Sequence, residues 1–132
     1  VKSMWLKTVG SAAWLAKIFM EMRWAVVVSE APAFITTDNP VVAIHEELRF
    51  RGIRNTGTTI VFPLSPTRVL NMDWRREEPN GAYYRLNGTA AAANSLMWRD
   101  AYRDMFSSRH PDEVCAEIAA SGEGTADSER RK

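Results

Sequence analysis

The chain has 132 residues, of which 45% are hydrophobic and 25% are charged, values that are typical of a globular domain. Its formal net charge of +1 does not indicate a nucleic-acid partner, and no apolar run approaches the ~20 residues of a membrane span. The single cysteine, Cys115, excludes an internal disulfide framework and is typical of a reducing compartment, so we expect a cytoplasmic protein. Because no apolar run is long enough to span a membrane, we also expect that the protein does not bind membranes.

Residues 3–22 are predicted to form an amphipathic helix, because apolar side chains recur at steps of three and four residues. These side chains are Trp5, Val9, Ala12, Leu15, Phe19 and Met22. The aromatic residues Trp5, Trp14 and Phe19 of this helix have two interpretations, a binding stripe or ordinary core packing. We favour core packing, because aromatic residues at helical spacing most often face a core.

The middle of the chain is predicted to form about five short strands in a mostly antiparallel sheet. Short β-branched or alternating runs, separated by turn-forming residues, indicate these strands. They lie at residues 24–28, 34–36, 59–63, 68–73 and 82–86, and residues 41–44 are expected to add a further short piece after Pro40. The first two runs are close in sequence, so we expect them to form a hairpin. Residues 45–58 are polar and punctuated by glycine, which predicts a long exposed loop.

Helices are predicted again after the strands. Asn87 is expected to cap a helix that ends at about residue 107, and residues 112–120 form a second helix. Small, polar and charged residues dominate residues 121–132, which we expect to be a disordered tail. This order predicts one α+β domain at residues 1–120, in which the N-terminal helix and the C-terminal helices flank the sheet and pack on one face.

The most informative short motif is Asp38-Asn39-Pro40, which follows the predicted strand 34–36. Aspartate and asparagine favour turns, and proline forces the residue before it to be extended, so a structural turn explains all three residues. A carboxylate beside an amide at the end of a strand is also a common way to present a general base or a metal ligand. Spacing alone favours the turn and leaves both interpretations open.

Complete catalytic motifs are absent from the sequence. A zinc-protease motif would need a second histidine four residues after His45, where the chain has Arg49, and we therefore expect no metal site and no cofactor. Nucleases of the restriction-enzyme type combine carboxylates with a lysine, and the lysines lie outside the predicted sheet, at positions 2, 7, 17 and 132. Cys115 is expected to be a buried structural thiol on the last helix.

Arginines form the most prominent set of candidate binding residues. Arg49, Arg51 and Arg54 fall in the long loop, and Arg75 and Arg76 fall in a charged turn. Guanidinium groups can bind phosphate or carboxylate with two hydrogen bonds. The other interpretation is a pair of solvated loops whose arginines are balanced by neighbouring glutamates, and we favour it.

Three segments of the sequence resemble, in this order, the bacterial family catalogued as domain of unknown function 4238. They are residues 24–28 followed by FITTDNPVV, then IVFPLSPTRVL at residues 60–70, and NSLMWRDAYRDMFSS at residues 94–108. The first departs from the family pattern at Thr37, where serine is more usual. The resemblance covers residues 20–108. It implies that Asp38, Asn39 and Asn94 occupy family-typical positions, which makes a site at Asp38 and Asn39 as well supported as a turn. Asn94 is expected to reach from its helix to the backbone of that turn.

Two functional hypotheses follow. The favoured one is a non-catalytic protein-interaction module, for example a small inhibitor encoded by a phage or mobile element and built on a truncated family member, that binds a protein partner or a second copy. Members of the family usually carry a longer N-terminal region with a His-containing segment, which is missing from this sequence. The alternative is a metal-assisted hydrolase or nuclease-like enzyme that uses Asp38, with Asn39, Glu30 or His45 assisting. The enzyme hypothesis requires these side chains to converge in one pocket.

Overall fold

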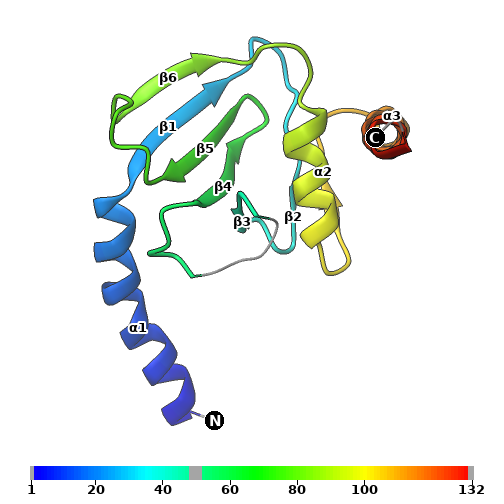
Figure 1. Ribbon diagram of the computed structural model, residues 1–132. Coiled ribbons are helices and arrows are strands. Elements are labelled where there is room, and N and C mark those ends of the chain that lie inside the picture. Colours follow the sequence, from blue (N-terminus) through cyan, green and yellow to red (C-terminus); the bar gives the residue numbers. More distant parts are fainter. Residues whose placement is uncertain (1, 48–51, 131–132) are drawn as a thin grey trace.

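The computed structural model describes residues 2–47 and 52–130 and has the predicted α+β architecture (Figure 1). Its elements, in chain order, are α1 (Lys2–Glu21), β1 (Arg23–Val28), β2 (Thr36–Thr37), β3 (Val42–His45), β4 (Thr58–Ser65), β5 (Arg68–Asp73), β6 (Ala82–Arg85), α2 (Ala91–Asp100), β7 (Met105–Phe106) and α3 (Pro111–Arg130).

Five strands form the main sheet, in the order β3-β4-β5-β1-β6. All neighbours are antiparallel except β1 and β6, which are parallel. The predicted hairpin between residues 24–28 and 34–36 is wrong, because β1 lies between β5 and β6 and β2 pairs with β7 in a separate two-stranded sheet. The physical reason is the length over which the strands can pair. β1 pairs with β5 over all six of its residues, whereas β2 is only two residues long.

The inner face of the sheet carries the larger hydrophobic core. Side chains from the sheet and from the segment before β2 pack there against α2 and α3, and α3 lies beside α2 (Figure 1). The buried members are Phe34, Ile35, Val42, Val61, Val69, Ala90, Met97 and Val114. This core places α2 next to β2 and β3, where the Asp38 motif lies.

A smaller cluster covers the outer face of the sheet, and only the end of α1 reaches it. Met22, which directly follows α1, is buried with residues of β4 and β5, and Phe19 packs against this cluster. The rest of α1 extends away from the sheet (Figure 1). Core packing of Trp5 and Trp14 is therefore wrong, since these side chains are 69% and 58% exposed. No other element in the described part of the chain lies along the first turns of α1 to cover them.

The C-terminal helices differ from the prediction in their bounds. The helix expected at residues 87–107 spans only Ala91–Asp100, and Ala101 is already extended, with φ −63° and ψ 141°. The chain then turns and forms β7, for a reason that lies in the Asp38 motif. The last helix, α3, continues beyond residue 120, where the sequence predicted its end. Disorder of residues 121–132 stays a prediction.

Cys115 is exposed, which contradicts the expected buried thiol. Two α3 residues four positions apart, Val114 and Ile118, face the inner core. Successive residues of a helix point about 100° apart, so the residue after Val114 is turned away from that core. The buried side of this helix is therefore too narrow to include Cys115.

Candidate functional site

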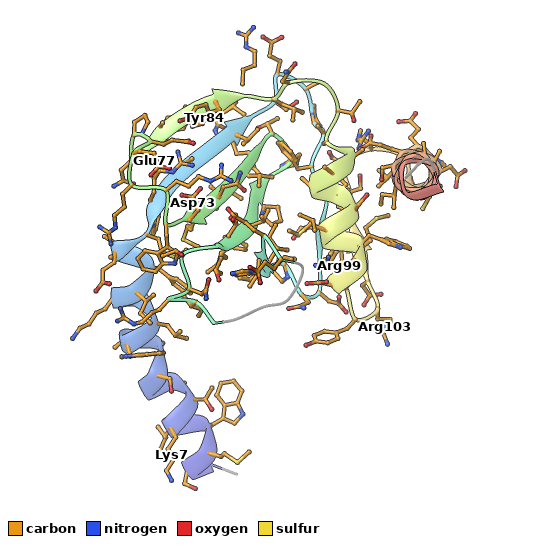
Figure 2. The ribbon with its side chains drawn as sticks, viewed as in Figure 1. Lys7, Asp73, Glu77, Tyr84, Arg99 and Arg103 are labelled. Atoms are coloured by element: carbon orange, nitrogen blue, oxygen red, sulfur yellow. The ribbon has the colours of Figure 1, made fainter. Side chains whose placement is uncertain are left out.

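The carboxylate of Asp38 binds the turn that follows α2. Its Oδ1 accepts a hydrogen bond from the backbone N–H of Tyr102 at 3.0 Å. Its Oδ2 accepts from the N–H groups of Arg103 at 2.9 Å and Asp104 at 3.3 Å. The Asp38 N–H in turn donates to the carbonyl of Asp104 at 3.1 Å. Three successive N–H groups thus converge on one carboxylate, an arrangement that typically binds an anion. In Figure 2, Arg103 marks this turn at the end of α2.

These hydrogen bonds set the charge state of Asp38. Partial loss of hydration acts to raise the pKa of the carboxyl, but the N–H groups of Tyr102, Asp104 and Arg103 together hold the pKa below its ordinary value. Because the folded-state pKa is lowered, the carboxylate stabilises the fold above the ordinary carboxyl pKa of about 3.9. That contribution is lost as the pH falls through the folded-state pKa.

Asn39 holds the other side of the same junction. Its side-chain Nδ2 donates to the carbonyl of Asp100, the last residue of α2, at 2.9 Å. Carbonyls at the end of a helix have no partner within the helix, so this bond satisfies a group that would otherwise need water. The Asn39 N–H donates to Thr37 Oγ1 at 3.2 Å, which closes the turn itself. We call Asp38 and Asn39, with residues 100–104, the α2 clasp.

Asn94 is fully buried and binds the backbone just before β2. Its Oδ1 accepts from the N–H of Ile35 at 3.1 Å, and its Nδ2 donates to the carbonyl of Ala33 at 2.9 Å. The same Nδ2 donates to Glu117 Oε1 on α3 at 3.1 Å. Asn94 therefore binds the backbone of Ala33 and Ile35 instead of the turn at Asp38 that the resemblance implied.

Arg109 completes this network, although no pattern in the sequence pointed to it. Its Nη1 donates to Glu117 Oε2 at 2.8 Å, and its Nη2 donates to the Ala33 carbonyl at 3.0 Å. Asn94, Arg109 and Glu117 thus join the segment before β2 to both α2 and α3. Only the family-typical position of Asn94 pointed to this region. Arg109 lies in the linker between β7 and α3, and nothing near Glu117 in the sequence distinguishes it from a solvated glutamate.

Glu30 and His45 have partners elsewhere. Glu30 pairs with Arg85 at 3.2 Å on an exposed surface. Nδ1 of His45 accepts from the Glu47 N–H at 3.1 Å, which makes Nε2 the protonated nitrogen that donates to Asn55 Oδ1 at 2.7 Å. His45 therefore organises its own loop. Across residues 2–47 and 52–130, no three His, Cys, Asp or Glu side chains gather in a way that could hold a metal ion.

Each candidate arginine that the structure describes has a partner in its own chain. Arg54 pairs with Glu21 of α1 at 3.3 Å, and Arg75 lies 3.9 Å from Glu78. Arg76 lies over the Trp74 ring, 5.8 Å from its centroid. Exposed pairs of this kind contribute little to stability, so these guanidinium groups remain accessible to other partners. Arg49 and Arg51 lie outside the described residues.

Helix α1 carries a set of large apolar side chains that are exposed. Six of them are between 58% and 74% exposed, at Met4, Trp5, Leu6, Val9, Trp14 and Met20. Figure 2 shows Lys7 on the same part of the helix, far from the sheet. Within the described residues, no helix has the length and apolar character needed to cross a membrane. We call the surface formed by these six side chains the α1 surface.

A change of Asp38 to Asn tests the α2 clasp. Asparagine keeps one acceptor oxygen but turns an NH₂ group toward the N–H groups of the turn, so Asp38→Asn lowers the stability at pH 7. The gap between wild type and variant shrinks as the pH falls toward 3, because the wild-type carboxylate becomes protonated. Urea unfolding at pH 7, 5, 4 and 3 measures this gap, with the exposed Glu77→Gln as control. A gap that is constant across this range would contradict the assignment.

A change of Asn94 to Asp tests the buried network. The new carboxylate still accepts from Ile35 but faces Glu117 and the Ala33 carbonyl, so Asn94→Asp costs about 3 kcal/mol of unfolding free energy. Adding Glu117→Gln restores a donor opposite that carboxylate, and the double variant is more stable than Asn94→Asp by about 1 kcal/mol. Denaturant unfolding of the four proteins gives the coupling energy. Strictly additive losses would show that the two side chains do not interact.

Comparison with known proteins identifies one family. The model of a family described as "Protein of unknown function (DUF4238)" matches residues 6–111. No curated protein and no solved structure matches the chain. The matched range includes the whole α2 clasp, Asn94 and Arg109. Because it covers most of the chain, this protein belongs to the DUF4238 family, as the resemblance of its three segments predicted.

Proposed function

We propose that this chain is a non-catalytic protein-interaction module that docks through α1. The observation that carries the proposal is the α1 surface, on which six large apolar side chains are more than half exposed. Large apolar side chains that gather on one exposed element mark interaction sites in folded proteins. The partner is a different protein with an apolar groove that takes up a helix.

The physics of an isolated helix supports this proposal. Helices in proteins owe most of their stability to the packing of an apolar face, and within the described residues only the last turns of α1 pack against the sheet. Its exposed side chains point in several directions around the axis, with Leu6 and Val9 on one side and Trp14 on another. A helix that is apolar around most of its circumference is normally enclosed by other protein segments.

Charge indicates the character of the groove. Three of the four lysines of the chain, Lys2, Lys7 and Lys17, belong to α1. Its only acidic residue is Glu21, which already pairs with Arg54 at 3.3 Å. The complementary groove is therefore rimmed by carboxylates. A second copy of α1 would bring lysines against lysines, so we favour a different protein over a homodimer.

A membrane surface is a less suitable partner. Helices that lie in a membrane interface have a continuous charged face opposite an apolar face. On α1 the lysine side also carries the exposed Trp14, since Lys7 and Trp14 are two turns apart. This distribution suits a groove that surrounds the helix.

The alternative of a metal-assisted hydrolase finds no support in the geometry. Both oxygens of Asp38 already accept backbone N–H groups, and Glu30 and His45 bind other partners. We therefore do not propose catalysis at Asp38. An inhibitory role and a cytoplasmic location stay predictions from the sequence.

Site-specific photocrosslinking tests the docking element. A photoreactive residue at Val9 is expected to yield one main crosslinked protein in extracts of the organism that encodes the chain, and excess synthetic peptide of residues 2–21 abolishes it. The control position is Tyr83, which is 72% exposed, against 58% for Val9, but lies on β6. Equal crosslinking at both positions, or a product that is only the homodimer, would overturn the proposal.

Substitutions on α1 then test the groove with the purified partner. Trp14→Ala weakens binding by about 30-fold, as expected for an aromatic anchor worth about 2 kcal/mol, and leaves the Tm of the free chain unchanged because Trp14 is exposed. Lys7→Glu lowers the affinity and reduces the dependence of the affinity on salt concentration. Lys7→Arg keeps the positive charge and therefore retains the wild-type affinity and salt dependence. Calorimetry and thermal unfolding measure these effects. Unchanged affinity of Trp14→Ala would contradict docking through α1.

A further inference from the structure

The inner face of the sheet changes from apolar to polar along the strands. On β1 and β5, Val27 lies opposite Val69 near the covered end. Two residues further along each strand, on the same face, the pair is Ala25 with Asn71, and then Arg23 with Asp73. An inward-facing asparagine in the middle of a sheet is unusual, because buried polar groups are costly unless they are bonded.

An open cavity of about 520 Å³ lies over this polar end, between the sheet and α2. Val27, Leu86 and Leu96 contribute apolar walls, and Asn71, Thr59 and Asn87 contribute uncharged polar groups. Its size is within the range of small-molecule sites, which are mostly apolar with a few polar groups that fix orientation.

A buried ion pair closes one end of the cavity. Arg23 Nε and Nη2 donate to the two oxygens of Asp73 at 2.9 and 2.7 Å, and Nη1 lies 2.9 Å from Glu78 Oε2. Figure 2 shows Asp73 at the end of β5, next to β1. Burying such a pair in place of apolar side chains rarely adds stability. The cations Arg23 and Arg75 balance the anions Asp73 and Glu78, so this end of the cavity has no excess charge that would attract an ion.

The uncharged polar groups of the cavity are free to bind a ligand. Asn71 and Thr59 are half-buried, and Asn87 lies at the mouth. Their side chains make no hydrogen bond to any residue that the structure describes. Asn71 can both donate and accept through its amide. A ligand that pairs with it therefore needs a donor and an acceptor side by side on one edge.

We propose that this cavity binds an uncharged nitrogen heterocycle of the nucleobase class. The Asn71 amide pairs with the donor–acceptor edge of the ring, and the Thr59 hydroxyl bonds a second polar atom. The apolar walls cover the ring faces. This site is separate from α1 and does not depend on docking through that helix.

Ligand-observed NMR and calorimetry test the proposal with cytosine, uracil, adenine and hypoxanthine. Toluene serves as an apolar probe and benzoate as an anionic one. At least one base is expected to bind more tightly than both comparison probes. The corresponding nucleosides are titrated as well, to distinguish a free base from a base that carries a sugar. If the base binds and its nucleoside does not, the ligand is a free base. If both bind, the mouth of the cavity has room for the sugar.

Two substitutions separate binding from folding. Asn71→Leu is expected to weaken binding about tenfold or more, the cost of at least one lost hydrogen bond, while it keeps or raises the Tm because it replaces a half-buried amide by an apolar group. Thr59→Val weakens binding by a smaller factor, and the exposed Thr56→Val is the matched control. The proposal is overturned if no base binds at millimolar concentration, if toluene or benzoate binds better, or if affinity survives both substitutions.

Discussion

The three backbone N–H groups that converge on Asp38 fix the position at which α2 ends. Without that carboxylate, the four-residue spacing of Met97, Ala101 and Met105 would favour continued helix, as the sequence predicted. With it, the chain turns at Tyr102 and forms β7, which pairs with β2. Asn39 satisfies the last carbonyl of α2, and Asn94 and Arg109 bind the segment before β2. The position of α2 over the sheet depends on these contacts, and so does the cavity beneath it.

The sequence predicted local features well and failed at interactions between distant residues. Periodicity located the helices and strands, and the Asp38 motif marked a family-typical position. The pairing of β1 was missed because β5 lies more than 40 residues away, and the end of α2 was missed because its cause, Asp38, is 64 residues from Tyr102. Trp5 and Trp14 were assigned to a core because periodicity shows that a face is apolar, but not what covers it. Arg109 gave no signal because nothing local distinguishes it from a solvated arginine.

The family-typical polar residues of this chain bind its own backbone, and we therefore look for its function at other surfaces. Backbone groups of the same chain are bound by the side chains of Asp38, Asn39 and Asn94. The polar atoms of these side chains therefore hold α2 in position. The features that internal packing leaves unexplained are the α1 surface and the polar end of the inner sheet face. The first suits a protein groove, and the second suits a small uncharged ligand. The two proposals rest on different residues and can fail separately.

The central claim is that Asp38 is a structural anion rather than a catalytic group. NMR titration tests it most directly, by following the amide protons of Tyr102, Arg103 and Asp104 and the carboxyl carbon of Asp38 from pH 7 to 2. If Asp38 is a structural anion, all four signals titrate together, with a midpoint below the ordinary aspartate pKa of about 3.9, and Asp38→Asn abolishes the shift of the three amides. Amide signals that do not respond, or a carboxyl that titrates above that value, would contradict it.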